Sequence, residues 1–286
     1  MSTQITTAFV EQYKSNVLHL AQQKGSRLRD TVRYESVTGK NHFFERIGAV
    51  SAQKRTSRHS DTPRMDTPHS RRRVSMDDYD WADLIDQEDK VRMLITPQSE
   101  YAMAGANAMG RAMDTAIIEA AVGNAYGGVA GGTTIALPSA QKIVHGSAGL
   151  TVTKLLEAKE IIDGSDVDAE EERFCILTAK QVTDLLNSTE VKSSDYNTVK
   201  ALAQGQLDTF LGFKFIRSER LGTDSDGNRQ VTVYCKSGLG LAMGSEIQTR
   251  ISERDDKNYA TQVFLSMTIG ATRVEDEKVV EIACTE

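Results

Sequence analysis

The N-terminal part of the chain combines a helical pattern with an extended one. Over residues 6–24, apolar side chains recur at intervals of three and four, which predicts an amphipathic helix on an N-terminal arm, with Gly25 as its expected stop. Over residues 31–50, β-branched and aromatic side chains recur around a turn signal at Thr38 and Gly39. That pattern predicts paired extended strands, because such side chains suit a pleated, half-buried surface.

A long helix is the clearest element of the sequence. Thr96 is a good N-cap, and Pro97 suits the first helical position, where its missing N–H is no loss. The helix is expected to continue to Val122, with many Ala and Gly residues that let a sheet or another helix approach closely. Its apolar stripe comprises Met103, Ala106, Gly110, Met113, Ile117 and Ala120.

The residues after the glycine-rich connector NAYGGVAGG predict a compact lobe of helices and strands. Helices are expected at residues 151–162 before Gly164, at TAKQVTDLLNS with Thr178 as its cap, and from Tyr196 to about Phe210. Strands are expected at RFCIL, GFKFIRSERL and RQVTVYCKS, and the Asp-Gly in GTDSDGN joins the last two as a hairpin.

The C-terminal stretch from Tyr259 to Cys284 predicts a strand meander. Alternation places one set of apolar residues on a single face: Val263, Leu265, Met267 and Ile269. A turn at EDEK then leads into the apolar run VVEIA.

Composition limits the classes of function. The 286 residues are 39% hydrophobic and carry 34 Lys and Arg against 40 Asp and Glu, a formal net charge of -6. Such a chain can bury a substantial core, but its acidic balance gives no reason to expect general binding to nucleic-acid phosphates. The three cysteines lie far apart, which suits reduced core thiols better than disulfides or zinc ligands. The sequence has no signal-peptide or membrane-span pattern, so the protein is expected to be made and kept in the cytoplasm.

Opposite charges are segregated into two neighbouring blocks. Between residues 54 and 73 the sequence is basic and almost free of apolar side chains, so this segment has no core of its own. Its seven cations are Lys54, Arg55, Arg58, Arg64, Arg71, Arg72 and Arg73. Seven acids follow without a base: Asp77, Asp78, Asp80, Asp83, Asp86, Glu88 and Asp89.

The basic block has three interpretations: a solvated face, a nucleic-acid patch, or a loop that docks on an acidic surface of a neighbouring subunit. The adjacent acids favour docking, since complementary charge in trans sets register and partner choice around a ring of identical subunits. Folding back within one subunit would gain only about 0–1 kcal/mol for each exposed pair. Under this hypothesis, reversal of Arg71, Arg72 and Arg73 to Glu impairs assembly and leaves the isolated subunit folded.

The sequence carries no catalytic or metal-ligating constellation. GLGLAMG, at residues 238–244, departs from the glycine spacing of a dinucleotide fingerprint, and GGVAGGTT lacks the Lys of a phosphate-binding loop. A partial calcium-loop pattern at residues 224–228 has Cys235 where a bidentate Glu is needed, so a hairpin turn is the expected use. The five histidines show no paired-ligand spacing. We therefore expect no metal, no cofactor and no enzymatic activity.

The order of these elements resembles the major capsid proteins of tailed double-stranded-DNA bacteriophages, whose α+β fold is named for phage Hong Kong 97. The resemblance extends over essentially the whole chain. It rests on the order of the predicted elements and on the kinds of residues in them, since no part of it is a catalytic signature. Its most specific parts are the charged hairpin followed by PQSEYAMAGANAMGRAMDTAIIEAA, the stretch LGFKFIRSERL, and the final run from LAMGSEIQTRISERDDKNYATQVFLSMTIGATRV to VVEIA.

The resemblance implies a division of the chain and a function. The implied parts are an N-terminal arm at 1–28, an extended E-loop β-hairpin at 29–90, a peripheral domain with a long spine helix and a β-sheet at 91–124 and 236–286, and an α/β axial domain at 125–235. Such subunits assemble into pentamers and hexamers, which form the icosahedral head shell that encloses the packaged genome. The protein would then be part of the virion, assembled in the bacterial cytoplasm.

The implied partners are further copies of the chain, a scaffolding protein, a portal protein and a decoration protein. Double-stranded DNA would be enclosed without sequence-specific binding, and no membrane is involved. Because the chain passes almost directly from Met1 into the arm, the scaffold is expected to be encoded separately. Two alternatives stay open: an encapsulin-type nanocompartment shell, which encloses a cargo enzyme, and a cytosolic α/β enzyme that binds a nucleotide at GLGLAMG. DNA content and particle size test the first, and nucleotide affinity tests the second.

Overall fold

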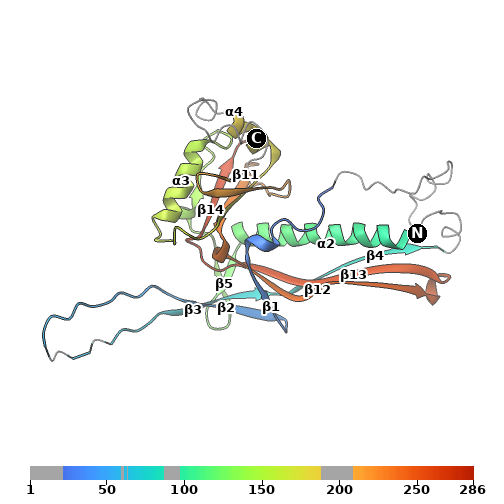
Figure 1. Cartoon of the computed structure of the whole chain (residues 1–286), viewed down its shortest axis with the longest axis horizontal. Helices are drawn as coiled ribbons and strands as arrows, with labels where there is room; N and C mark the ends of the chain where they lie inside the picture. The colour runs from blue at the N-terminus through green and yellow to red at the C-terminus, as the bar shows by residue number, and fades with distance from the viewer. Residues whose placement is uncertain (1–21, 59–60, 63, 87–96, 188–208) are drawn as a thin grey trace.

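The computed structural model describes residues 22–58, 61–62, 64–86, 97–187 and 209–286. Figure 1 shows an elongated molecule with a long layer of helix on sheet, an α/β lobe on one side of it, and a hairpin that projects from one end. The described helices are α2 (Pro97–Val122), α3 (Val152–Asp163) and α4 (Ala179–Asn187), with short 3-10 helices at Arg29–Thr31, Ser139–Gln141, Lys236–Gly238 and Asp255–Lys257.

The described strands form three sheets, which we call the long sheet, the lobe sheet and the hairpin sheet. The long sheet has the order β1 (Arg33–Ser36), β12 (Leu239–Arg254), β13 (Ala260–Arg273), β4 (Asp77–Ile85). The lobe sheet has the order β7 (Lys142–Ile143), β14 (Val279–Cys284), β11 (Arg229–Cys235), β8 (Arg173–Leu177), β10 (Phe213–Arg217), β9 (Thr209–Phe210). The hairpin sheet has the order β2 (Asn41–Ile47), β3 (His69–Ser75), β5 (Ala125–Gly127), β6 (Thr133–Ile135).

Helix α2 begins at Pro97, as predicted, and lies along one face of the long sheet (Figure 1). That face is apolar because alternate residues of β13 point toward the helix. The predicted set is buried there: Val263, Leu265, Met267 and Ile269. The predicted helix stripe is buried at Met113 and Ile117, whereas Met103 is 48% exposed, so the stripe does not extend to the first turns.

The segment before β1 is fixed on the other side of α2. The fully buried carboxylate of Asp114 accepts hydrogen bonds from the Ser26 hydroxyl at 2.6 Å and from the backbone N–H groups of Arg27 and Leu28. The helix backbone comes this close because Gly110 has no side chain; an added Cβ would lie 2.4 Å from the backbone of residue 25. A buried carboxylate needs such donors, so this contact orders the chain where it enters the fold.

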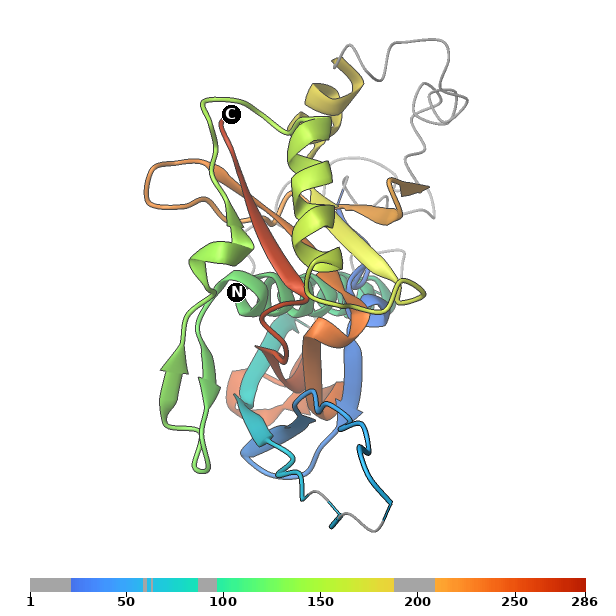
Figure 2. The ribbon, with the colours of Figure 1, turned by 90° about the vertical axis from the view of Figure 1, so that its left-hand side faces the viewer.

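The α/β lobe contains two of the predicted helices, α3 and α4, and the three predicted strands, β8, β10 and β11. Every residue of β8 is buried, and α3 is capped at its N-terminus by the Thr151 hydroxyl, which accepts from the Lys154 N–H. Gly164 ends that helix, as expected. Figure 2 shows α3 standing against the lobe sheet, and the apolar faces of α3 and α4 complete the core of the lobe.

Two predicted strand pairings are wrong. Strands β10 and β11 do not form a hairpin, because β8 lies between them, parallel to β10 and antiparallel to β11. The fully buried β8 takes the central place, where both its edges are paired. The turn between β10 and β11 still closes locally, since the Asp224 carboxylate accepts from the N–H groups of Asp226 and Asn228. The C-terminal meander is also wrong, because β13 belongs to the long sheet and β14 to the lobe sheet.

The two strands predicted around Thr38 and Gly39 exist, but they do not pair with each other. β1 pairs in parallel with β12, and β2 pairs antiparallel with β3. Residues 22–24 are not helical, so the predicted N-terminal helix does not reach that far, and its remainder lies outside the described residues. The helix predicted from residue 196 also lies outside them, except that Thr209 and Phe210 form β9.

Candidate functional site: surfaces for subunit contact

The hairpin formed by β2 and β3 projects from the body and carries the basic segment at its tip (Figure 1). At the root of this loop, the Gly48 N–H donates to the carbonyl of Pro68 at 2.8 Å. The described residues between them form neither helix nor strand and are exposed to solvent, including the four predicted cations Lys54, Arg55, Arg58 and Arg64. Two acids in the loop, Asp61 and Asp66, leave the positive charge concentrated at residues 54–58. We call residues 49–58 the basic arm.

The three consecutive arginines of β3 are used differently from the basic arm. Arg71 is 39% exposed, pairs with Glu45 at 3.2 Å and lies over the Phe43 ring. Arg73 lies over the ring of Tyr126 in the neighbouring strand β5. Both side chains are half-buried on the hairpin sheet, so their contact with a neighbouring subunit stays a prediction.

Arg72 differs from both, because its side chain is buried and bound within its own subunit. Its side chain is 3% exposed, and its Nη2 lies 2.5 Å from the Asp276 carboxylate of the same subunit. Arg273 binds the other oxygen of Asp276 at 2.6 Å and donates to the carbonyls of Ala121, Gly123 and Ile135. This buried network joins the hairpin to the end of α2. Reversal of Arg72 to Glu would bring two buried carboxylates together, so we expect the triple reversal to destabilise the subunit itself.

The acidic block lies on β4, at an edge of the long sheet. Asp77, Asp78 and Asp80 are exposed, while Asp83 and Asp86 are half-buried; Glu88 and Asp89 lie outside the described residues. Figure 1 shows that β4 runs away from the basic loop, which projects at the opposite end of the long axis. Neighbours in sequence are thus separated in space, and the two charged surfaces face different directions. We call β4 the acidic edge.

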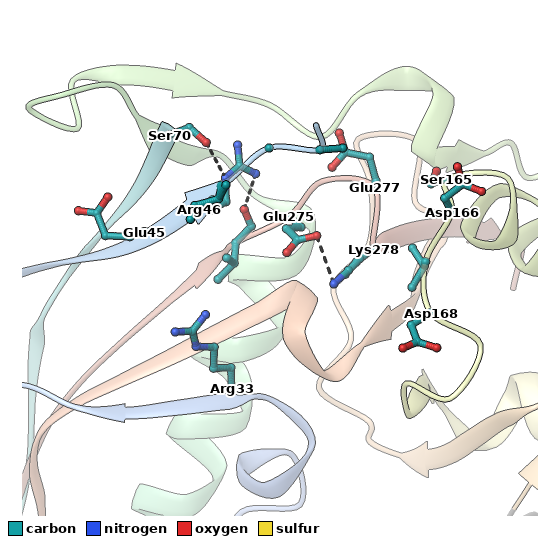
Figure 3. A pocket seen from close by; sticks show the side chains of 15 residues that line it. Arg33, Glu45, Arg46, Ser70, Ser165, Asp166, Asp168, Glu275, Glu277 and Lys278 are labelled. Atoms are coloured by element: carbon teal, nitrogen blue, oxygen red, sulfur yellow. Dashed lines mark hydrogen bonds and ion pairs between the residues drawn. The ribbon is translucent and has the colours of Figure 1, made fainter. Parts of the chain in front are cut away.

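An open groove of about 560 Å³ lies between the hairpin root and the lobe. Figure 3 shows side chains of both signs around it, among them Arg46 from β2 and Lys278 from the segment before β14. Arg46 donates to the Val274 carbonyl at 2.7 Å, and Lys278 lies 3.3 Å from carboxylate oxygens of Glu171 and Glu275. Arg46 and Lys278 are therefore already paired within the subunit. The groove separates two polar surfaces of one chain, and these two cations do not converge on a place for a ligand.

The motifs considered for chemistry have structural uses. GLGLAMG forms the end of a 3-10 helix and the start of β12, so it does not present a loop to a phosphate. Cys175, Cys235 and Cys284 are free and buried, as predicted, and burial raises the pKa of Cys235 and Cys284 to about 11, which keeps both thiols protonated. In the described ranges, no cluster of His, Cys, Asp or Glu could hold a metal ion. No helix of the part of the chain described here is long and apolar enough to cross a membrane.

Sequence reasoning missed Lys154, which lies on the buried face of α3. Its Nζ donates to the carbonyls of His145, Ala148, Gly149 and Ala283 at distances of 2.8–3.0 Å. The ammonium therefore joins a loop to the last strand of the lobe sheet. A lysine among the core positions of an amphipathic helix was the available signal, because such a charge needs buried partners.

The described surface thus carries a projecting basic arm and a separate acidic sheet edge, and the buried thiols are protonated. A family model described as phage capsid protein matches residues 5–286. The chain belongs to this phage capsid protein family. It is a shell-forming structural protein of the virion and not an enzyme.

Solved structures show the same fold. The capsid protein of the cyanophage P-SCSP1u has 19% identity and a TM-score of 0.75 over 100% of this chain and 96% of that chain. The capsid protein of Ralstonia phage GP4 has 11% identity and a TM-score of 0.75 over 96% of this chain and 94% of that chain. A native GTA particle has a capsid protein with 11% identity and a TM-score of 0.73 over 100% and 98%. Among curated proteins, none matches this sequence.

Proposed function

We propose that this chain is the major capsid protein of a tailed phage, assembled as pentamers and hexamers into an icosahedral head around double-stranded DNA. In this proposal, residues 1–28 form the N-terminal arm, 29–90 the E-loop, 91–124 and 236–286 the peripheral domain with α2 as spine helix, and 125–235 the axial domain. The fold is of the Hong Kong 97 type. A separate scaffolding protein, a portal protein and a decoration protein are the proposed partners besides the chain itself.

The observation that carries this proposal is the placement of opposite charges at opposite ends of one subunit. The basic arm projects beyond the hairpin, where it cannot pack on its own core, and the acidic edge runs the other way (Figure 1). A contact between two different surfaces of identical subunits is heterologous, and a heterologous contact closes into a ring when its rotation is suitable. Such rings are the form that pentamers and hexamers require. Complementary charge then sets which surfaces meet.

Electron microscopy of the chain co-expressed with its scaffolding protein tests the proposal. We expect icosahedral particles from the natural chain and their loss when Lys54, Arg55 and Arg58 are all changed to Glu. Circular dichroism should show that the unassembled triple variant is folded, because these side chains are exposed in the subunit.

The matched control exchanges the same residues without changing charge: Lys54→Arg, Arg55→Lys and Arg58→Lys. This variant should form normal particles. Small uniform particles from the natural chain under all conditions would refute the shell function. Normal shells from the Glu variant would refute the docking role of the basic arm and leave the shell function intact.

A further inference from the structure

The acidic edge presents open backbone hydrogen-bonding groups. β4 has nine residues, and in the described part of the structure its one partner strand is β13, so its other side has no strand beside it. Residues 78, 80 and 82 are exposed. A sheet edge of this length is a template for another strand unless it is covered or protected.

The direction of the free N–H groups follows from one hydrogen bond. The Leu84 N–H donates to the carboxylate of Asp83 at 2.8 Å and therefore points away from β13. The β4–β13 register is regular over the whole strand, and N–H direction alternates along an antiparallel strand. The N–H and C=O groups of Asp80 and Ala82 therefore also point outward. Asp83 supplies an internal partner at Leu84, so the open donors lie on the preceding residues.

The charges of this edge select what can pair with it. Aspartate is unfavourable in strands, yet β4 carries Asp77, Asp78, Asp80 and Asp83. Acidic side chains along an edge repel a second acidic strand and favour a cationic one. They lie on both faces of the sheet, because residues 77 and 83 alternate with 78 and 80.

We propose that the basic arm of a second copy adds to the acidic edge as a fifth strand of the long sheet. This inference rests on the proposed docking and specifies how it is made. The arm is exposed, forms neither helix nor strand in the subunit, and places Lys54 and Arg58 on one side of an extended chain and Arg55 on the other. Cations would therefore meet acids on both faces of the extended sheet. The arm and the edge lie at opposite ends of one subunit, which favours pairing between copies over pairing within one (Figure 1).

Backbone pairing would supply affinity to the contact between the arm and the edge, which exposed side-chain charges alone supply only weakly. Main-chain hydrogen bonds hold the added strand, while alternate side chains decide which strand is accepted. The same contact removes an exposed edge from each subunit, so an assembled ring has fewer open edges than its free subunits.

Proline at residue 82 tests the backbone step separately from charge. Proline removes the outward N–H of Ala82 but no bond to β13, and an edge strand tolerates it on its solvent side. We expect Ala82→Pro to remain folded and to lose particle formation. Ala82→Ser keeps the N–H and should form normal particles. Electron microscopy and sedimentation of both variants, co-expressed with the scaffolding protein, give the readout.

Hydrogen–deuterium exchange on the natural chain gives a second readout, which decides the matter even where Ala82→Pro fails to fold. Peptides covering residues 77–86 and 49–58 should exchange more slowly in particles than in unassembled subunits. Equal exchange of residues 77–86 in both states, or normal particles from a folded Ala82→Pro variant, would overturn the added strand. If those results occur while the triple Glu variant of the arm still loses particles, docking stands and only strand addition fails. If the triple Glu variant also assembles, the proposed docking itself fails.

Discussion

Lys154 shows how a single residue can hold a loop and a strand together. Its side chain is buried, and burial lowers its pKa, while Cys284 and Glu157 act in the opposite direction. Four backbone carbonyls surround the ammonium, so its charge is stabilised by peptide dipoles. The partner carbonyls belong to residues 145–149 and to β14, which are far apart in sequence. The side chain thus adds to the backbone bond that the Thr285 N–H donates to the Ala148 carbonyl directly after β14.

Replacing Lys154 with Met should destabilise the subunit by about 2–4 kcal/mol, because buried carbonyls lose a charged donor and gain no substitute. Urea unfolding of the unassembled subunit measures this loss. Lys159→Met is the matched control, since Lys159 lies on the same helix, is only half-buried and should change stability by less than about 0.5 kcal/mol. Equal unfolding free energies for the two variants would show that the four carbonyls do not depend on the ammonium.

At the scale of elements, local patterns predict which segments are helices and which are strands. Helix α3 begins after Thr151 and ends at Gly164 because its cap and its stop are local signals. Strand pairing is not local, and its prediction from chain order fails for β10 with β11 and for β13 with β14. The observed pairings place β8, every residue of which is buried, between two other strands. Such a choice depends on the burial of all strands together, which a window of sequence does not contain.

The closeness of α2 to the N-terminal segment predicts an unusual effect of a small substitution. Alanine is normally favoured over glycine in a helix by about 1 kcal/mol. At Gly110 the added Cβ would lie 2.4 Å from backbone atoms of Gly25, so that segment must move and lose its bonds to Asp114. We expect Gly110→Ala to cost about 1–3 kcal/mol in urea unfolding, as overpacking does.

The control for this substitution is Gly132→Ala, at a position where an added Cβ meets nothing within 4 Å. Its effect should stay within about 0.5 kcal/mol, as is usual at open surface positions. A stabilised Gly110→Ala variant would mean that residues 22–28 do not rest on the helix as described.

At the scale of the whole molecule, the sequence predicts the charges of the candidate site but not their geometry. The exposure of Lys54, Arg55 and Arg58 follows from a segment without apolar residues. Burial of Arg72 was not predictable from the run of three arginines, because its partner Asp276 is distant in sequence. The two charged blocks are adjacent in sequence, so their separation in space could not be predicted either. That separation arises because β3 leads almost directly into β4, which continues away from the hairpin.

Exchange of charge between the two surfaces is the sharpest prediction at this scale. Asp78→Lys combined with Asp80→Lys should abolish particles, as Lys54→Glu, Arg55→Glu and Arg58→Glu should, because each change leaves like charges facing each other. All five substitutions in one chain should restore particle formation at least in part, since the surfaces are again complementary. The measurement is the sedimented particle fraction of each co-expressed variant. Assembly of the natural chain should also weaken as salt rises from about 0.1 M to 1 M, where screening shortens the reach of exposed charges from about 10 to 3 Å. If the exchanged chain assembles no better than either half, these two surfaces do not meet, and the ring is held by other contacts.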